Sequence, residues 1–177
     1  GKSEFTISTW AKGWPSGGWT PYISKRGEGQ GWQLRRRASD AENISFTLRG
    51  PGNDDWYVTK NINDGKWHHL VAAWGGGKRK FYVDGLLLGS ENRSGTVTPT
   101  GSQLVLGARD DSGNAGNPPN IGFHSGIKLD DVRFYDVPLT DQDVGAIYNN
   151  GQGDQVPPVD TDGDGISDAV DPDDDND

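Results

Sequence analysis

The stretch "WHHLVAAWGGGKRKFYVDG", residues 67–85, decides the fold. Two segments rich in aromatic and β-branched residues flank three consecutive glycines at 75–77, and the stretch ends in the turn sequence Val83-Asp84-Gly85. Such segments predict β-strands, and glycine supplies the backbone freedom that tight hairpin turns need. The stretch therefore predicts an antiparallel hairpin followed by a second tight turn.

Segments of the same kind lie on both sides of this hairpin. They are "EFTISTW" (4–10), "GWQLRRR" (31–37), "NISFTLRG" (43–50), "QLVLGA" (103–108) and "LDDVRFYD" (129–136). Gly, Asn, Asp and Pro separate them. Many short strands at this spacing predict an all-β fold, a sandwich or jelly roll of two antiparallel sheets.

One short helix is predicted after the last strand. Thr140 is followed three residues later by Asp143, which has the pattern of a capping box with Asp in the position of Glu. The residues that would share the apolar face of the helix are Val144, Ile147 and Tyr148. Gly151 is expected to end the helix, which would pack against the sandwich.

The net charge of −9 originates at the C-terminal end. Residues 1–159 carry 17 acidic and 17 basic residues, whereas residues 160–177 carry nine acidic and no basic ones. We therefore expect a β-sandwich domain over 1–151, a linker over 152–159 and an acidic tail over 160–177. A neutral body with an acidic tail argues against a nucleic acid partner. No apolar run approaches the roughly 20 residues of a membrane span.

The order of five segments carries a family resemblance. "FTISTW", "WHHLVAAW", "FYVDG", "LVLGARDDSGNAG" and "SGIKLDDVRFYDVPLTDQDVGAIYNNG" together resemble the LamG-like (laminin G, concanavalin A-like) jelly-roll family, with pentraxins as distant relatives. The resemblance covers about residues 3–151 and implies two antiparallel sheets of about 12–14 strands, one of them curved. Family members usually have one or two strands before "FTISTW", so the resemblance leaves open whether this sandwich is smaller or begins further upstream.

The adjacent histidines His68 and His69 raise the possibility of a metal site or a general base. Neighbouring residues of a strand point to opposite faces, so these two cannot bind one metal ion together. The third histidine, His124, lies in a Gly/Asn/Pro-rich loop sequence without a partner. In the LamG-like family "WHH" is a structural piece, with the Trp between the sheets and a His anchoring backbone. We expect a structural role here.

Carboxylates do not show the pattern of a glycosidase. Glycosidases on this architecture place two carboxylates around one bond, but no two of the chain's four glutamates are close in sequence. The adjacent Asp130 and Asp131 would point apart. There is no Gly-x-Ser-x-Gly motif and no phosphate-binding loop. We expect a domain that is not an enzyme.

Aromatic residues in two loop sequences are candidates for ligand contact. Flat aromatic rings can stack on the apolar faces of sugars, and loops at the rim of a scaffold often carry function. The predicted ligand-binding aromatic residues, from "WPSGGWTPY" and "GNDDWYV", are Trp14, Trp19, Tyr22, Trp56 and Tyr57. The alternative is that they cap the ends of the core. Predicted core tryptophans are Trp10, Trp67 and Trp74.

Three arginines are further candidates. In "WQLRRR", strand alternation predicts that Trp32 and Leu34 point inward while Arg35 and Arg37 point outward. A planar guanidinium suits sulfate or carboxylate oxygens, which favours an acidic or sulfated polysaccharide. The alternative is a solvated face balanced by neighbouring acids. Arg109 is also included among the predicted ligand-binding residues.

The tail sequence "DTDGDGISD" has the spacing of a calcium loop. Alternating carboxylates, a glycine for the sharp turn and a backbone carbonyl match the front half of an EF-hand-like loop, and oxygen ligands favour Ca²⁺. The predicted ligands are Asp160, Asp162, Asp164, Ile166, Asp168 and Asp171. The pattern resembles a thrombospondin type 3 repeat; the alternative is a disordered acidic linker. In the body, resemblance to pentraxin and LamG-like segments implies Asp111 and Asp131 as further calcium ligands.

These features favour a binding function. We expect a non-catalytic, lectin-like carbohydrate-binding module of a secreted or cell-surface multi-modular protein. It would bind a polysaccharide, with Ca²⁺ as cofactor, and target an attached enzyme to it; its other partners would be neighbouring modules of the same chain. The alternative is an adhesive or spacer domain that binds a protein partner at the cell surface.

Overall fold

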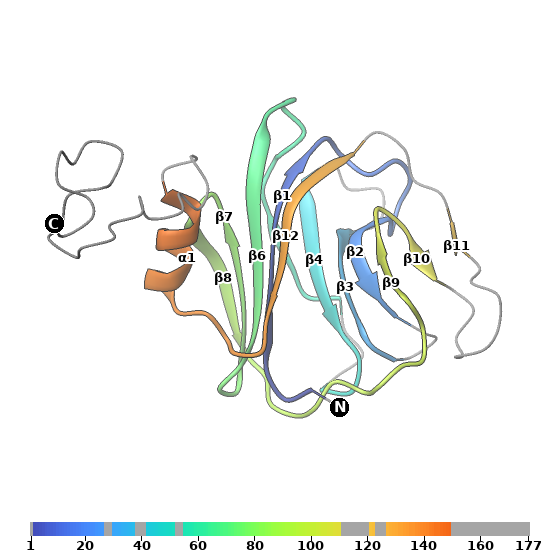
Figure 1. The fold of residues 1–177 in the computed structure, drawn as a ribbon, viewed down its shortest axis with the longest axis vertical. Coiled ribbons are helices and arrows are strands. Elements are labelled where there is room, and N and C mark those ends of the chain that lie inside the picture. The colour runs from blue at the N-terminus through green and yellow to red at the C-terminus, as the bar shows by residue number, and fades with distance from the viewer. Residues whose placement is uncertain are drawn as a thin grey trace, which may run out of the picture.

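In a computed structural model, the described part of the chain forms two five-stranded antiparallel sheets packed face to face, a small two-stranded sheet and one short helix (Figure 1). The structure describes residues 2–26, 30–37, 42–51, 55–110, 121–122 and 127–149. The predictions for Asp111, His124, the linker and the acidic tail concern residues outside this description. Within it, the predicted jelly-roll-like fold is confirmed.

The first sheet has the strand order β12-β1-β6-β7-β8. Its strands are β1 (Phe5–Lys12), β6 (Trp67–Gly75), β7 (Lys78–Val83), β8 (Leu86–Asn92) and β12 (Lys128–Tyr135). The glycines at 75–77 join β6 to β7 with φ angles of 149°, 58° and 73°. Asp84 (φ 52°) and Gly85 (φ 76°) join β7 to β8. Both predicted turns are therefore confirmed.

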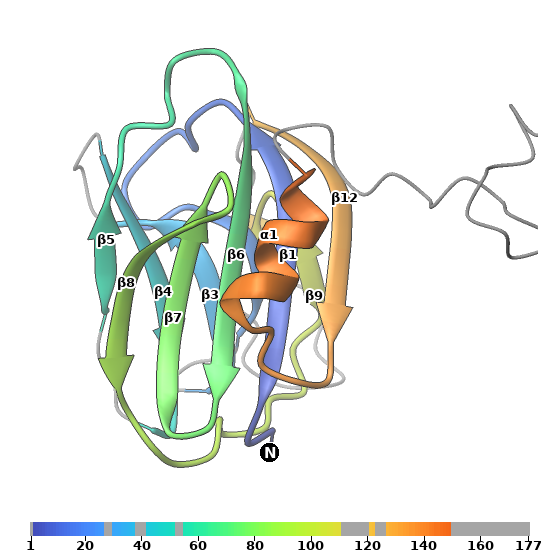
Figure 2. The ribbon, with the colours of Figure 1, turned by 90° about the vertical axis from the view of Figure 1, so that its left-hand side faces the viewer.

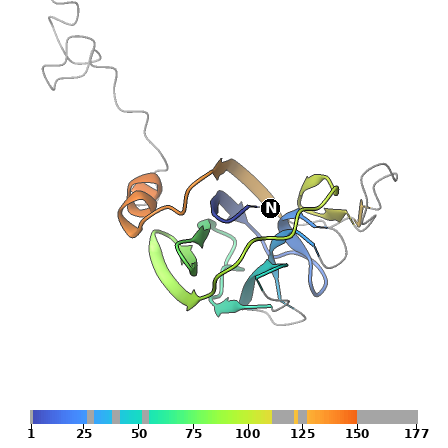
Figure 3. The ribbon, with the colours of Figure 1, turned by 90° about the horizontal axis from the view of Figure 1, so that it is seen from below.

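The second sheet has the order β5-β4-β3-β2-β9, and β10 and β11 form a separate two-stranded sheet. The strands are β2 (Pro21–Lys25), β3 (Trp32–Arg36), β4 (Asn43–Leu48), β5 (Tyr57–Thr59), β9 (Leu104–Leu106), β10 (Arg109–Asp110) and β11 (Ile121–Gly122). Figure 3, seen along the strands, shows the two layers. At one side of the sandwich the edge strand β5 contacts the edge strand β8 of the first sheet.

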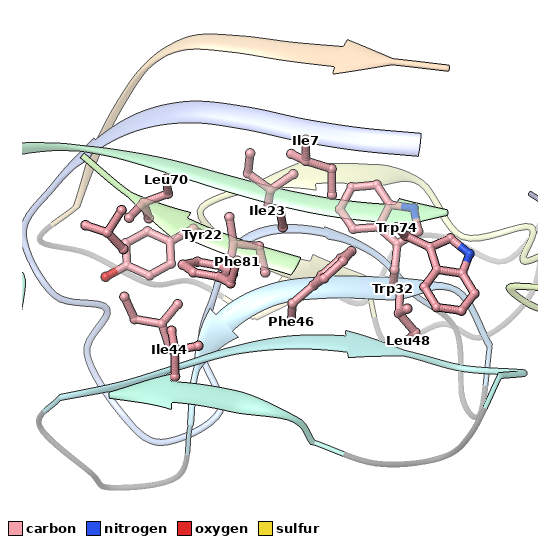
Figure 4. Close-up of a cluster of buried hydrophobic side chains, with 14 of the residues drawn as sticks. Ile7, Tyr22, Ile23, Trp32, Ile44, Phe46, Leu48, Leu70, Trp74 and Phe81 are labelled. Carbon is pink, nitrogen blue, oxygen red and sulfur yellow. The ribbon is translucent and has the colours of Figure 1, made fainter. Parts of the chain in front are cut away.

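The core lies between the sheets because each strand turns one face inward. Buried side chains from both sheets form one cluster, shown in Figure 4 with Trp32 and Trp74 at one end and Tyr22 at the other. Trp74 is 1% exposed, as predicted for a core residue. The prediction for Trp67 was wrong: it starts β6 at the end of the sandwich and is 40% exposed.

Helix α1 (Asp141–Tyr148) covers the outer face of the first sheet (Figure 2). The capping box is confirmed: the Asp143 backbone N–H donates to Thr140 Oγ1 at 3.2 Å, and the Thr140 N–H donates to the Asp143 carboxylate at 2.8 Å. The helix is capped by Asn149 in the left-handed conformation, before the predicted stop at Gly151. No helix among the described residues is long and apolar enough to cross a membrane.

Candidate functional site

The outer face of the second sheet carries a row of side chains that combines exposed rings with polar groups. Arg35 of β3 pairs with Ser45 of β4, and Ser45 pairs with Tyr57 of β5. The Trp19 ring lies over the Arg35 guanidinium, with 4.6 Å between the ring centroid and Cζ. We call Trp19, Arg35, Ser45 and Tyr57 the Trp19–Tyr57 row.

Two rings of the row reach solvent. Trp19 is 37% exposed and Tyr57 is 42% exposed. Each is backed by an arginine, since Arg37 Cζ lies 4.1 Å from the centroid of the Tyr57 ring. Adjacent strands are about 4.8 Å apart, so the backbones of Arg35 and Tyr57 are about 10 Å apart. The row therefore extends across two strand spacings of the sheet.

Asp55 organises the polar groups beneath the rings. Its carboxylate forms an ion pair with Arg35 and accepts a hydrogen bond from Thr47 Oγ1 at 3.2 Å. Arg49 lies 3.9 Å from the same oxygen. Ser45 Oγ in turn donates to the Trp56 carbonyl at 2.9 Å. Such a network fixes the rings in place and leaves the Asp55 side chain 31% exposed to solvent.

The prediction that Arg35 points outward was right about the face and wrong about exposure. Trp32 and Leu34 belong to the core cluster, so Arg35 lies on the opposite face. Its side chain is nevertheless only 4% exposed. Burial lowers the pKa of Arg35 to about 10, against the opposing effect of Asp55, and the nearby charges of Arg26 and Arg49 lower it further. Arg35 is therefore a support for Trp19 and a partner of Asp55.

The loop that presents Trp19 is fixed at several points. Trp19 has a positive φ angle of 68°, and Thr20 Oγ1 donates to the Ser16 carbonyl at 2.6 Å. The Arg36 guanidinium donates to the Pro15 carbonyl at 3.0 Å. Hydrogen bonds of this kind hold the loop against β3, so that the ring of Trp19 is presented on an ordered backbone.

Other predicted ligand-binding aromatic residues have core positions. Tyr22 is fully buried in the core cluster, so its prediction as a surface contact was wrong. Trp14 packs partly buried against Tyr22, with the rings edge to face. Trp56 also packs against the core, with the Arg79 guanidinium 4.8 Å from its ring centroid. The structure describes only the backbone of Arg109, so the prediction for its side chain stays open.

Three polar side chains of this face were not singled out from the sequence. Gln33, Ser45 and Thr47 are fully buried, although they lie on the outer side of the sheet. Gln33 Oε1 accepts a hydrogen bond from Arg35 at 3.0 Å. The signal was present in "NISFTL", where Ser45 and Thr47 alternate with core residues and fall opposite the outward positions of β3.

The two histidines of β6 have separate and structural surroundings. His68 lies between the carboxylates of Asp84 and Asp64, with nitrogen–oxygen distances of 2.8 and 3.0 Å. His69 is 2% exposed, contacts Ser8 Oγ at 2.8 Å and stacks against Tyr148 of α1. As predicted, they occupy opposite faces of the strand. Asp84 also accepts a hydrogen bond from the His69 backbone N–H, which anchors the β7–β8 turn.

The described residues by themselves do not fit a calcium ion. Across them, no group of three or more His, Asp or Glu side chains comes together in a way that could hold a metal. The Asp131 carboxylate accepts a hydrogen bond from Arg133 Nε at 2.6 Å. The remaining predicted ligands, Asp111 and those of the acidic tail, lie outside the description, so calcium binding stays a prediction.

Sequence comparison gives a family match over most of the chain. A family model of the laminin G type, described as the concanavalin A-like lectin/glucanases superfamily, matches residues 1–145. The chain is also 33% identical over 94 residues to the sushi, von Willebrand factor type A, EGF and pentraxin domain-containing protein 1 of Rattus norvegicus. That alignment covers 51% of this chain and only 3% of the rat protein.

Solved structures with low sequence identity share the fold. A native heptameric SAP-like pentraxin from Limulus polyphemus is 18% identical, with a TM-score of 0.59 over 83% of this chain and 70% of the pentraxin. A structure of botulinum neurotoxin type C, whose cell entry depends on interaction with two ganglioside molecules, is 16% identical, with a TM-score of 0.55. That match covers 85% of this chain and 36% of the neurotoxin chain.

Proposed function

Because this chain belongs to the concanavalin A-like lectin/glucanases superfamily, we propose that it is a lectin-like carbohydrate-binding module and that the Trp19–Tyr57 row is its polysaccharide-binding surface. One observation carries the proposal: two exposed rings on one sheet face are each held in place by a guanidinium. Rings positioned in advance lose little conformational entropy on binding.

Recognition by this row would depend mainly on stacking. Each ring offers a flat face to the apolar side of a sugar. Asp55 offers carboxylate oxygens that can accept hydrogen bonds from hydroxyl groups. Arg35 is buried and paired, so its charge is committed to Asp55. The guanidinium of Arg37 lies against the Tyr57 ring, so it supports that ring in the same way as Arg35 supports Trp19.

Affinity electrophoresis through gels that contain neutral, carboxylated or sulfated polysaccharides tests the proposal. We expect retardation in at least one gel, and loss of most of it in Trp19→Ala and Tyr57→Ala variants. Trp67→Ala is the matched control, because Trp67 has similar exposure (40%) on the other sheet. The proposal would fail if no polysaccharide retards the chain, or if the control loses retardation equally.

We further propose that the module breaks no bond. Support comes from Asp55, a carboxylate beneath the rings of the row. It is held by Arg35, Thr47 and Arg49 rather than free to act as acid or nucleophile. A retaining or inverting glycosidase needs two carboxylates about 5–10 Å apart across one bond. Release of new reducing ends from a polysaccharide that the chain retards would contradict this proposal.

The wider context of the module is also a proposal. We place it in a secreted or cell-surface multi-modular protein, where it would hold an attached enzyme on its polysaccharide. The acidic tail would be a thrombospondin type 3-like calcium-binding spacer to the next module. The tail's alternating aspartates support this part, and calcium titration tests it.

A protein-binding role is the second candidate. The edge strand β8 exposes three consecutive leucines: Leu86 (69%), Leu87 (42%) and Leu88 (37%). An edge strand with apolar side chains can accept a partner. If adhesion to cells survives removal of surface glycans and is lost in Leu86→Asp but not in Trp19→Ala, this role is favoured over sugar binding.

A further inference from the structure

A separate cavity of about 330 Å³ lies at one end of the sandwich. Its size is at the lower limit of the about 300–1,000 Å³ typical of small-molecule sites. The lining residues are Lys2, Lys25, Gly31, Trp32, Val97, Thr98, Pro99 and Thr100. Figure 3 views this end, where the connection from β8 to β9 passes the N-terminal residues. Trp32 marks the same end of the core in Figure 4.

Lys25 occupies an unusual position beside this cavity. It pairs with Trp32 on one side and with Leu104 on the other, and so extends the inward-facing row of Trp32 and Leu48. A lysine at the end of an inward-facing row packs its aliphatic stem on apolar neighbours and directs its ammonium group toward the opening. The Lys25 ammonium donates to the Ser102 carbonyl at 3.2 Å.

Within the part of the chain that the structure describes, no acid pairs with Lys25. Of the ion pairs found among the described residues, none involves Lys25. The other lysine of the cavity, Lys2, pairs with the exposed Asp136. A partly buried ammonium with one neutral acceptor gains from an anionic partner, because a charge-assisted hydrogen bond is stronger than a neutral one.

The other residues that line the cavity indicate the chemical nature of the remaining part of the ligand. Trp32, Val97 and Pro99 are apolar, and the two threonines add methyl groups. A sugar would bury several hydroxyl groups against such walls with few partners, which is costly. We propose that this cavity binds a small carboxylate that carries an aromatic ring or short alkyl chain, with the apolar part against Trp32 and the carboxylate on Lys25.

This site is independent of the Trp19–Tyr57 row. Trp32 and Lys25 lie on the inner face of the second sheet at its end, whereas the row lies on the outer face. A ligand in the cavity would therefore leave the row accessible. Loss of polysaccharide binding in the row variants would not affect the cavity, and loss of carboxylate binding would not affect the row.

Titration of the chain with 3-phenylpropanoate, followed by the indole N–H signals in a ¹H–¹⁵N spectrum, tests the proposal. Trp32→Phe assigns the signal of Trp32 among the seven tryptophans. We expect a saturable shift of that signal, and about tenfold weaker binding of the neutral 3-phenylpropanamide. This acid-against-amide comparison uses the unaltered chain, so it stays decisive whatever the stability of the variants.

Two lysine variants test whether the ammonium group of Lys25 binds the carboxylate of the ligand. Lys25→Met keeps the stem, and we expect it to bind the acid no better than the amide. Lys66→Met is the matched control, because Lys66 is exposed on the segment before β6 and should not alter binding. The proposal is overturned if the Trp32 signal does not shift saturably, if acid and amide bind equally, or if both lysine variants bind the acid alike.

Discussion

Acidification should destabilise the fold through His69. The imidazole is 2% exposed and packs against the rings of both Trp10 and Tyr148. Burial lowers the pKa of His69 to about 4; the carboxylates of Asp84 and Asp131 oppose this shift, and Arg133 adds to it. The folded state therefore holds this imidazole neutral at pH values where the unfolded chain, with an ordinary pKa of 6.5, is protonated.

The direction and size of this change in the free energy of unfolding follow from proton linkage. Between pH 6.5 and 4 the unfolded state binds more protons at this position, so stability falls as pH falls. A shift from 6.5 to about 4 corresponds to a loss of about 2 kcal/mol at pH 5, and about 3 kcal/mol once the pH is below 4. For a domain stabilised by about 5–15 kcal/mol, such a loss is easily measured.

Urea unfolding of the wild type and His69→Phe at pH 8 and pH 5 tests this prediction. Phenylalanine keeps a ring against Trp10 and Tyr148 but cannot titrate. The carboxylates common to both proteins therefore cancel in the comparison. We expect the wild type to lose about 2 kcal/mol more than the variant between the two pH values. Equal losses would refute the assignment of a buried neutral imidazole.

The stability contributed by His68 should change with pH in the opposite direction to that of His69. Burial lowers its pKa, but hydrogen bonds to Asp84 and Asp64 outweigh burial and raise the pKa above its ordinary value. Its contribution is fully present below pH 6.5 and is lost as the pH rises through the folded-state pKa. His68→Gln should therefore cost more stability at pH 5 than at pH 8.

Three further predictions concern single features. Thr140→Ala removes the capping box and should cost about 1 kcal/mol in urea unfolding; an unchanged midpoint would contradict the capping role. Gly31→Ala places a methyl group 2.0 Å from the Lys25 carbonyl at a φ of 74°, so it should destabilise far more than Gly65→Ala, which meets no atom within 4 Å. By calorimetry the full chain should bind more calcium than a variant lacking 160–177, and equal heats from both would exclude the tail as a site.

Strands with a typical strand composition and a glycine turn beside them could be predicted from the sequence. Strands that form only because a partner strand lies next to them could not. The hairpin of β6 and β7 combines strand composition with a glycine turn. In contrast, β2 begins with Pro21, β5 is three residues long and β8 begins with three leucines without alternation. Each of these forms because a partner strand offers hydrogen bonds, which no local pattern shows.

The sequence identified the types of residue at the candidate site better than it identified which of them are exposed. Trp19 and Tyr57 were identified as rings in polar loops, and both reach solvent. Tyr22 was grouped with them because it follows in the same segment, but it lies in β2 and its ring turns into the core. The exposure of a residue near a loop depends on the point at which the chain re-enters the sheet. A short stretch of sequence does not show that point.

The burial of Arg35 changes how the surface has to be interpreted. From the strand alone, alternation places its guanidinium outward, where it would meet an anionic sugar. The fold instead brings Asp55 and Trp19 over it from two other segments, which removes the guanidinium from water and pairs it. Removal of Arg35 would leave Asp55 without its main partner and Trp19 without support, so it would disturb fold and binding together. The exposed rings are therefore the positions at which a binding function can be separated from stability.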